Sequence, residues 1–303
     1  MPESTPYAEI LLSTYNGANY LEELLESVLA QSYNQWCLVI RDDGSTDKTV
    51  EILHRYRSDY PDRVKLITDD QMRLGAKDSF ARLLSLSQAE LVFLCDQDDV
   101  WHHDKMKIMI DRYSHILHDL KANHNTPILI CSDLVIVDSA KNLLYRSFRE
   151  KEKIFLEFTS DLYMTFFANF SPGCAMMLNR QLACISSTIP SEAVMHDWWI
   201  SLSAILHGKV EIVPEKLVNY RIHQQNTIGI REDSSANPLF KLIKIISSKT
   251  KISSFMQNHR TAIDQAKAFC KTNGLYFRLL RYWSKVFQWY VNYYLLRKKR
   301  AAG

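Results

Sequence analysis

The sequence has few glycines and lacks both glycine-rich motifs that commonly hold phosphates. Only eight of its 303 residues are glycine, and neither GxGxxG nor GxxxxGK[ST] occurs. In those motifs, backbone N–H groups of a tight loop surround the phosphates of a nucleotide. A nucleotide bound by this chain must therefore be held in another way.

Cysteine pairs, a signal peptide and long apolar runs are also missing. Cysteines without CxxC or Cys/His spacing are typical of reduced core residues, so we expect a cytoplasmic protein. The N-terminus lacks the basic and apolar regions of a signal peptide. No uncharged apolar run reaches the roughly 18 residues of a transmembrane helix. The cysteines are Cys37, Cys95, Cys131, Cys174, Cys184 and Cys270.

The net charge of +3 conceals an uneven distribution of charge along the chain. Residues 239–303 contain 14 basic residues and one acidic residue, whereas residues 1–238 contain 23 basic and 33 acidic residues. The C-terminal part is therefore suited to an anionic partner. No nucleic-acid motif accompanies these basic residues, which favours a membrane surface and predicts no nucleic-acid partner.

The first 120 residues alternate between apolar runs and segments with helical spacing. This alternation predicts an α/β fold with a doubly wound, mostly parallel sheet. The expected strands are residues 7–13, 36–40, 64–68 and 91–95. The expected helices are residues 20–31, 48–60, 76–87 and 101–120.

Polar loops follow three of these expected strands, at residues 14–17, 42–47 and 96–99. In parallel sheets, ligands bind beyond the carboxyl ends of the strands. The three loops should therefore meet at one edge of the sheet and form a single site.

The loop at 96–99 contains three aspartates within four positions, directly after an apolar run. Carboxylates this close repel one another unless a cation lies between them, and hard divalent ions take such oxygen ligands. Mg²⁺ or Mn²⁺ carrying phosphates would suit this loop. The alternative is an aspartate-rich turn that caps the helix expected after it.

Beyond residue 120 the pattern is less regular. We predict one domain over residues 1–233, with two halves at about 1–100 and about 101–233. No element is predicted for residues 139–169. Further strands are expected at 128–137, 173–178, 210–213 and 216–220, and a helix at 197–207.

Residues 234–303 are predicted to form a basic, aromatic helical extension that begins with a linker at 234–238. From residue 276, helical spacing places aromatic and basic side chains on opposite sides, which suits a membrane interface. The basic tail at 297–300 adds attraction to anionic lipid. The alternative is a helix whose aromatic side packs on the domain.

Five motifs in this order have a combined specificity that none of them has alone. The chain resembles the GT-A glycosyltransferases of family 2, and within them bacterial rhamnosyltransferase-like enzymes of surface polysaccharide synthesis. The resemblance covers roughly residues 7–230. It implies that the domain at 1–233 is catalytic, with a nucleotide-sugar half at about 1–100 and an acceptor half at about 101–233. The motifs are STYNG at 13–17, RDDGSTDKT at 41–49, FLCDQDDVW at 93–101, HDWW at 196–199 and YRIHQQN at 220–226.

The resemblance implies roles for individual residues of the nucleotide and metal sites. Asp96 would lie near the ribose, and Asp98 would bind the metal ion within the DXD motif Asp96-Gln97-Asp98. His223 would be a further metal or diphosphate contact, although it also suits an ordinary polar strand end. The residues expected around the nucleotide base and ribose are Thr14, Tyr15, Asn16 and Asp43.

The resemblance also implies an acceptor site. Asp197 matches the catalytic base, although an N-cap of the helix is the alternative for this position. Trp198 and Trp199 could contact the sugar face or lie in the core. The implied reaction is inverting transfer of a sugar, with Mn²⁺ or Mg²⁺, to a saccharide acceptor that is lipid-linked at the inner face of the cell membrane. Rhamnose from dTDP-rhamnose is the first expectation for the donor, and UDP-linked sugars remain open.

Two other functions are compatible with parts of the sequence. Asp96-Gln97-Asp98-Asp99-Val100 fits the DxDx[TV] loop of haloacid-dehalogenase-like phosphatases, in which the first aspartate attacks phosphorus. That loop normally follows the first strand of its domain, whereas three strand-helix units precede it here. The other alternative is a non-catalytic, glycosyltransferase-like assembly partner.

Overall fold

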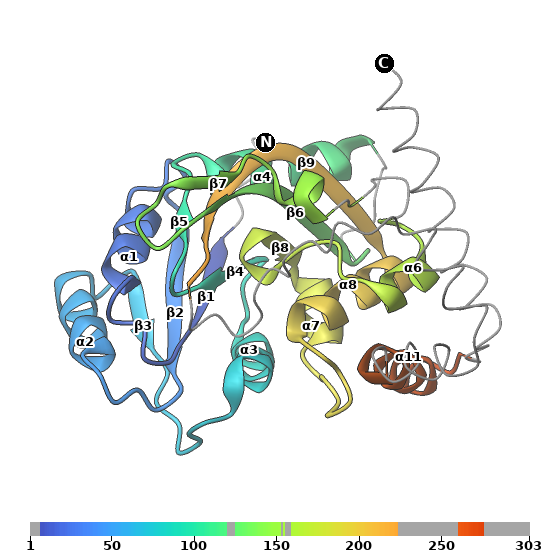
Figure 1. Ribbon diagram of the computed structural model, residues 1–303, viewed down its shortest axis with the longest axis horizontal. Coiled ribbons are helices and arrows are strands. Elements are labelled where there is room, and N and C mark those ends of the chain that lie inside the picture. Colours follow the sequence, from blue (N-terminus) through green and yellow to red (C-terminus); the bar gives the residue numbers. More distant parts are fainter. Residues whose placement is uncertain (1–6, 120–124, 153, 155–158, 224–259, 276–303) are drawn as a thin grey trace.

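One sheet of nine strands forms the centre of the computed structural model, which describes residues 7–119, 125–152, 154, 159–223 and 260–275. The strand order is β3-β2-β1-β4-β8-β6-β9-β5, and β7 pairs with β6 beside this path (Figure 1). The strands are β1 Ala8–Thr14, β2 Trp36–Asp42, β3 Val64–Leu66, β4 Leu91–Asp96, β5 Val100–Trp101, β6 Ile128–Val137, β7 Leu143–Tyr145, β8 Met176–Asn179 and β9 Lys209–Arg221.

The four strands of the N-terminal part are parallel, as the sequence predicted. Their apolar runs are continuous because helices cover both faces of a parallel sheet. The register pairs Thr14 of β1 with Asp42 of β2, and Ser13 of β1 with Asp96 of β4. The ends of the three strands are therefore level, and the polar loops after them begin at one edge.

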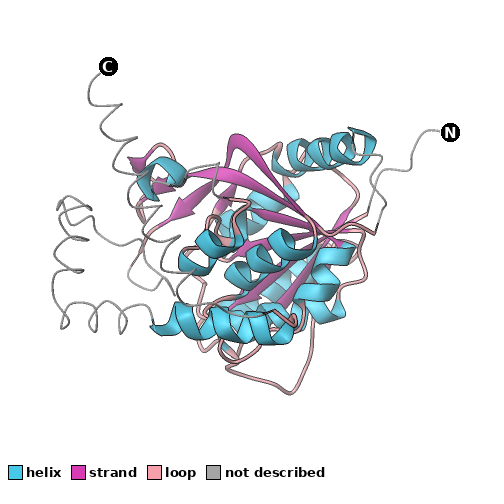
Figure 2. Cartoon of the chain, turned by 90° about the vertical axis from the view of Figure 1, so that its right-hand side faces the viewer, coloured by secondary structure: helices cyan, strands magenta, loops and turns pink. Residues whose placement is uncertain are grey.

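Helices pack on both faces of the sheet, as Figures 1 and 2 show. On one face, α1, α2 and α4 bury apolar side chains against β1, β2 and β4, and on the other, α3, α7 and α8 do so. In α1 the buried positions follow the spacing of a helix with one apolar face. The helices are α1 Leu21–Leu29, α2 Thr49–Asp59, α3 Gly75–Leu86, α4 Lys105–Asp119, α5 Phe148–Glu152, α6 Leu162–Phe167, α7 Arg180–Ser186, α8 His196–His207 and α11 Arg260–Thr272.

The second half of the sheet is mixed. Strand β8 runs antiparallel to both β4 and β6, whereas β9 runs parallel to β6 and antiparallel to β5. The two predicted strands at 210–213 and 216–220 are one strand, β9, whose register with β6 shifts on both sides of Asp133. The irregular pairing with β6 explains the gap between the two predicted strands, at residues 214–215.

Two other predicted bounds are corrected by pairing across the chain. The helix expected at 101–120 begins only at Lys105, because Val100 and Trp101 pair with β9. The strand expected at 173–178 starts with a short 3-10 helix, Gly173–Ala175, before β8. The structure also contains β7, α5, α6 and α7, for which the sequence predicted no elements.

The predicted halves at about 1–100 and 101–233 share one sheet, because β4 pairs directly with β8. Within the predicted extension at 234–303, α11 is helical, as expected. The linker at 234–238 and the aromatic helix from residue 276 lie outside the described residues, so they stay predictions. None of the helices in the described part of the chain combines the length and apolar composition that crossing a bilayer requires.

Candidate active site

The three polar loops meet at the carboxyl ends of β1, β2 and β4, as predicted. Gln97 accepts a hydrogen bond from the backbone N–H of Tyr15 and donates one to its carbonyl, both at 2.9 Å. Asn16, with φ of +48°, accepts a hydrogen bond from the Thr46 N–H at 2.8 Å. Gly17 permits the close approach of Gln97 to the loop after β1, because a Cβ at position 17 would lie 2.2 Å from the Gln97 Oε1 atom. The loop after β1 is therefore bonded to both neighbouring loops.

The residues predicted to bind the nucleotide differ in the solvent exposure of their side chains. Thr14 is buried, and its hydroxyl donates to Asp42 Oδ1 at 2.9 Å. The Asn16 amide oxygen is engaged with Thr46, whereas the ring of Tyr15 is 46% exposed. An exposed phenol ring at the mouth of these loops offers a flat surface on which a base can stack.

The carboxylate of Asp43 is 5% exposed and accepts three hydrogen bonds within the chain. Arg41 Nη1 donates at 2.7 Å, and the backbone N–H groups of Leu74 and Gly75 each donate at 2.8 Å. A carboxylate offers about four lone-pair sites, so one remains for a ligand. In the chain itself, Asp43 fixes the loop between β3 and α3.

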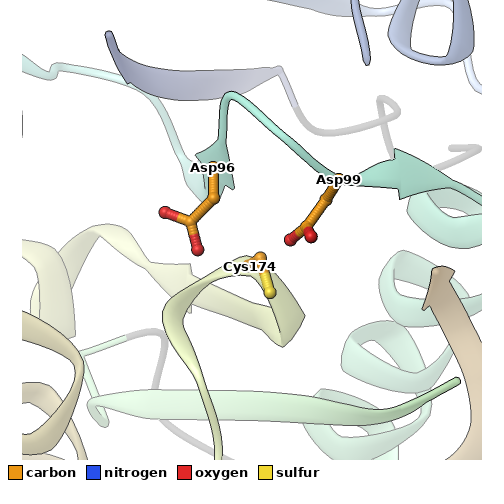
Figure 3. Close-up of side chains that lie close together, drawn as sticks. All are labelled: Asp96, Asp99 and Cys174. Carbon is orange, nitrogen blue, oxygen red and sulfur yellow. The ribbon is translucent and has the colours of Figure 1, made fainter. Parts of the chain in front are cut away.

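Asp96, Asp99 and Cys174 form the tightest acidic cluster in the described residues, with ligand atoms within 4.8 Å of one another (Figure 3). Asp99 is completely buried, and burial raises its pKa well above the ordinary value. Burial likewise raises the pKa of the Cys174 thiol. A thiol that keeps its proton is a poor metal ligand.

A buried lysine already offsets the charge of this cluster. The Lys105 ammonium is 0% exposed, donates to the Cys174 carbonyl at 2.6 Å and lies 3.3 Å over the Trp101 ring. Burial lowers its pKa to about 8, and the charges of Asp99 and Asp96 oppose that shift. The cluster is therefore less suited to a divalent ion than its spacing suggests.

Asp98 points to a different partner from its two acidic neighbours. Its Oδ2 atom lies 2.7 Å from Nε2 of His223, which follows the end of β9. The two side chains are 14% and 11% exposed, respectively. A carboxylate and an imidazole, completed by diphosphate oxygens, fit a divalent ion such as Mn²⁺. The two residues predicted to hold the metal thus lie in contact, although 125 positions separate them.

Asp197 lies in the first turn of α8 and belongs to the same end of the sheet. Its Oδ2 accepts a hydrogen bond from the Gly173 N–H at 3.2 Å, and its Oδ1 accepts one from the Trp198 N–H at 2.6 Å. Burial raises its pKa to about 6. The Asp197 charge also contributes, after burial and Asp98, to a raised pKa of Asp96. Asp197 can therefore accept a proton near neutral pH.

The ring of His196 lies close to Gly173, which begins the short 3-10 helix before β8. The His196 ring stacks on Phe80 with centroids 4.1 Å apart, and neither ring nitrogen has a hydrogen-bond partner among the described residues. Burial lowers the pKa of His196 to about 3, so the ring is neutral. A Cβ on Gly173 would lie 2.9 Å from His196 Nε2. Glycine is thus required by the close approach of the ring.

Replacing Gly173 with alanine should lower the free energy of unfolding by about 1–3 kcal/mol, the usual cost of overpacking. Urea denaturation followed by tryptophan fluorescence would measure it. In a His196→Ala background, where the ring is absent, the same replacement should cost less. An equal loss in both backgrounds would contradict the proposed clash.

The two tryptophans after Asp197 occupy different environments. Trp199 is 2% exposed and packs edge to face on Phe269 of α11, with centroids 5.0 Å apart. Its ring faces the core rather than an open site. Trp198 is half-buried, and its Nε1 donates to the Thr165 carbonyl. Of the two, Trp198 is the one still available to contact a sugar.

The sequence reasoning missed several residues that shape the site. Arg41 is completely buried and bonds Asp43, Asp69 and Ser79. Its position inside an apolar strand was the available signal. Lys105 stands four residues before the buried Met109, so helical spacing could have placed it on the inner face of α4.

The level ends of parallel strands, the acidic loops and a carboxylate facing them define a nucleotide-diphospho-sugar transferase fold of the GT-A type. Residues 9–122 match the family model described as glycosyl transferase family 2. The match takes in β1 to β4 and the loops that follow them.

Bacterial relatives with glycosyltransferase names agree with this match. An uncharacterised glycosyltransferase of Nostoc is 26% identical over 223 residues, which are 72% of this chain and 65% of that protein. The dTDP-rhamnosyl transferase RfbG of Shigella flexneri is 24% identical over 249 residues, or 78% of this chain and 80% of its own. The chain thus spans just under two thirds of the first relative.

Solved structures share the fold at low sequence identity. Staphylococcus aureus TarS 1–349 in complex with UDP-GlcNAc has a TM-score of 0.54 at 16% identity, over 88% of this chain and 74% of that one. The mannosyltransferase PcManGT of Pyrobaculum calidifontis, in complex with GDP-Man and Mn²⁺, has a TM-score of 0.55 at 15% identity, over 99% and 85%.

Proposed function

We propose that this protein is an inverting, metal-dependent glycosyltransferase that moves a sugar from a nucleotide donor to a saccharide acceptor in bacterial surface polysaccharide synthesis. The observation that carries the proposal is the position of Asp197. Its carboxylate is held by two backbone N–H groups, has a pKa raised to about 6, and faces the acidic end of β4.

Asp197 acts as the general base in this mechanism. It takes the proton of an acceptor hydroxyl, whose oxygen attacks the anomeric carbon of the donor. The bond between that carbon and the diphosphate breaks, and the nucleoside diphosphate leaves with the electron pair. One displacement inverts the anomeric centre, so no covalent intermediate is needed.

The remaining residues hold the donor. Tyr15 stacks on the base, and Thr14, Asn16 and Asp43 surround the base and ribose. Asp96 faces the ribose. Asp98 and His223 would hold Mn²⁺ or Mg²⁺, which offsets the charge that grows on the leaving diphosphate. An imidazole ligand favours Mn²⁺, because Mg²⁺ prefers oxygen ligands alone.

Rhamnose from dTDP-rhamnose is the donor we propose, supported by the name of the Shigella relative. A panel of dTDP-, UDP- and GDP-linked sugars incubated with Mn²⁺ would test it through release of the nucleoside diphosphate. Turnover of dTDP-rhamnose above all others is expected. Turnover of a UDP-sugar instead would support the proposed sugar transfer but contradict dTDP-rhamnose as the donor. Hydrolysis of p-nitrophenyl phosphate without any nucleotide-sugar turnover would favour the phosphatase alternative.

The reaction should depend on pH through Asp197. A general base works only when unprotonated, and the raised pKa moves its protonation to about pH 6. We therefore expect kcat/KM to fall as the pH drops below about 6 and to level off above about 7. Circular dichroism at each pH serves as the control for unfolding. A profile that stays level down to about pH 4.5 would contradict this role.

We further propose that the acceptor is lipid-linked and that the protein is peripheral on the cytoplasmic face of the cell membrane. The basic, aromatic sequence from residue 276 supports this. Deleting residues 275–303 should move the protein from the membrane fraction to the supernatant after lysis at low salt. Unchanged partition would contradict the proposed attachment.

A further inference from the structure

The side chain of Arg221 joins four parts of the chain next to the proposed metal site. It is 3% exposed at the end of β9. Its Nε donates to the Asp98 carbonyl at 2.9 Å and its Nη1 donates to the Ser139 carbonyl at 3.0 Å. Its Nη2 donates to Glu23 of α1, and the guanidinium lies 4.5 Å over the ring of Tyr20.

These contacts bear on both proposed metal ligands at once. Nε fixes the backbone of Asp98, whose carboxylate meets His223 at 2.7 Å. The Arg221 backbone N–H donates to Asp99 Oδ1 at 3.1 Å, and His223 stands two residues further along. The Tyr20 ring, under the guanidinium, also packs against the His223 ring at 4.8 Å.

We propose that Arg221 is a positioning residue for the metal site, and this inference rests on the proposed function. Without the guanidinium, the 96–99 loop and the end of β9 lose their shared anchor, and Asp98 and His223 are no longer held at one distance. Groups that orient metal ligands from behind typically contribute about 10–100-fold to metal affinity. The role requires the planar guanidinium, because it bonds three acceptors in fixed directions.

Mn²⁺ affinity of the full-length protein, measured without any nucleotide by loss of the free Mn²⁺ signal in electron paramagnetic resonance, tests this role. Arg221→Met should weaken Mn²⁺ binding by about 10–100-fold, and Arg221→Lys, which keeps the charge but not the fork, should also weaken it measurably. Arg55→Met is the matched control, because Arg55 pairs with the adjacent Glu22 of α1 and is 54% exposed. It should bind Mn²⁺ as the wild type does.

A double-mutant cycle separates positioning from general stability. If Arg221 acts through the contact of Asp98 with His223, Arg221→Lys should add little loss of Mn²⁺ affinity in a His223→Ala background. The same loss in both backgrounds, or wild-type Mn²⁺ affinity in both Arg221 variants, would overturn the inference. Absence of Mn²⁺ binding by the wild-type protein would also overturn the inference. Nucleotide-sugar turnover that continues in excess chelator would instead overturn the metal-dependent function, so the two failures are distinguishable.

Discussion

Replacing Asp197 with asparagine should lower kcat for sugar transfer by about 10²–10⁴-fold, the usual contribution of a general base. Asparagine keeps the shape of the side chain, but its single acceptor oxygen can keep only one of the hydrogen bonds from Gly173 and Trp198. It cannot accept the proton of the acceptor hydroxyl. Product formation at saturating donor and acceptor, followed by chromatography, would measure the effect.

The matched control for this change is Asp111→Asn, which removes an exposed carboxylate paired with Lys107 on α4. Asp111→Asn should leave kcat unchanged. Asp197→Asn should keep wild-type affinity for Mn²⁺ and for the nucleoside diphosphate, because only the catalytic step is affected. Near wild-type turnover by Asp197→Asn would exclude the proposed base. Loss of polysaccharide synthesis in cells carrying the variant would in turn argue against a non-catalytic assembly role.

Replacing Asp98 with alanine should strongly weaken Mn²⁺ binding and lower the transfer rate by about 10³-fold, equivalent to about 4 kcal/mol of transition-state stabilisation. The carboxylate is the anionic member of the proposed pair with His223, so the imidazole alone would hold a divalent ion weakly. Mn²⁺ titration and the initial rate at saturating Mn²⁺ would measure the two effects separately.

Replacing Cys174 with alanine distinguishes the two candidate metal sites. If the ion binds between Asp98 and His223, removing the thiol should leave Mn²⁺ affinity unchanged. If it binds instead in the tighter cluster of Asp96, Asp99 and Cys174, the same change should weaken binding. The buried Lys105, which donates to the Cys174 carbonyl, favours the first outcome because it already supplies a positive charge there.

The N-terminal half of the fold could be predicted closely because its signals are local. The continuous apolar runs that became β1, β2 and β4 indicate strands covered on both faces. Parallel pairing then places the ends of these strands at one edge. From that rule alone, the loops at 14–17, 42–47 and 96–99 had to meet.

The second half was harder to predict because its elements are defined by distant pairing. Strand β9 is irregular where it passes Asp133, and Val100 and Trp101 form a strand only through their pairing with β9. No local pattern shows such pairing, so the predicted bounds at 101 and at 210–220 were inaccurate. The short elements α5, α6 and β7 likewise pack without a clear period of their own.

The sequence by itself determined the types of element, the parallel sheet and the chemical character of the loops, since periodicity and residue type are local properties. Only the tertiary structure decided which charges meet. It separated Asp98, which contacts His223, from Asp96 and Asp99, which share a buried lysine. It also brought Asp197 to the end of β4. These contacts join residues about a hundred positions apart, and they depend on how the strands pair rather than on any local spacing.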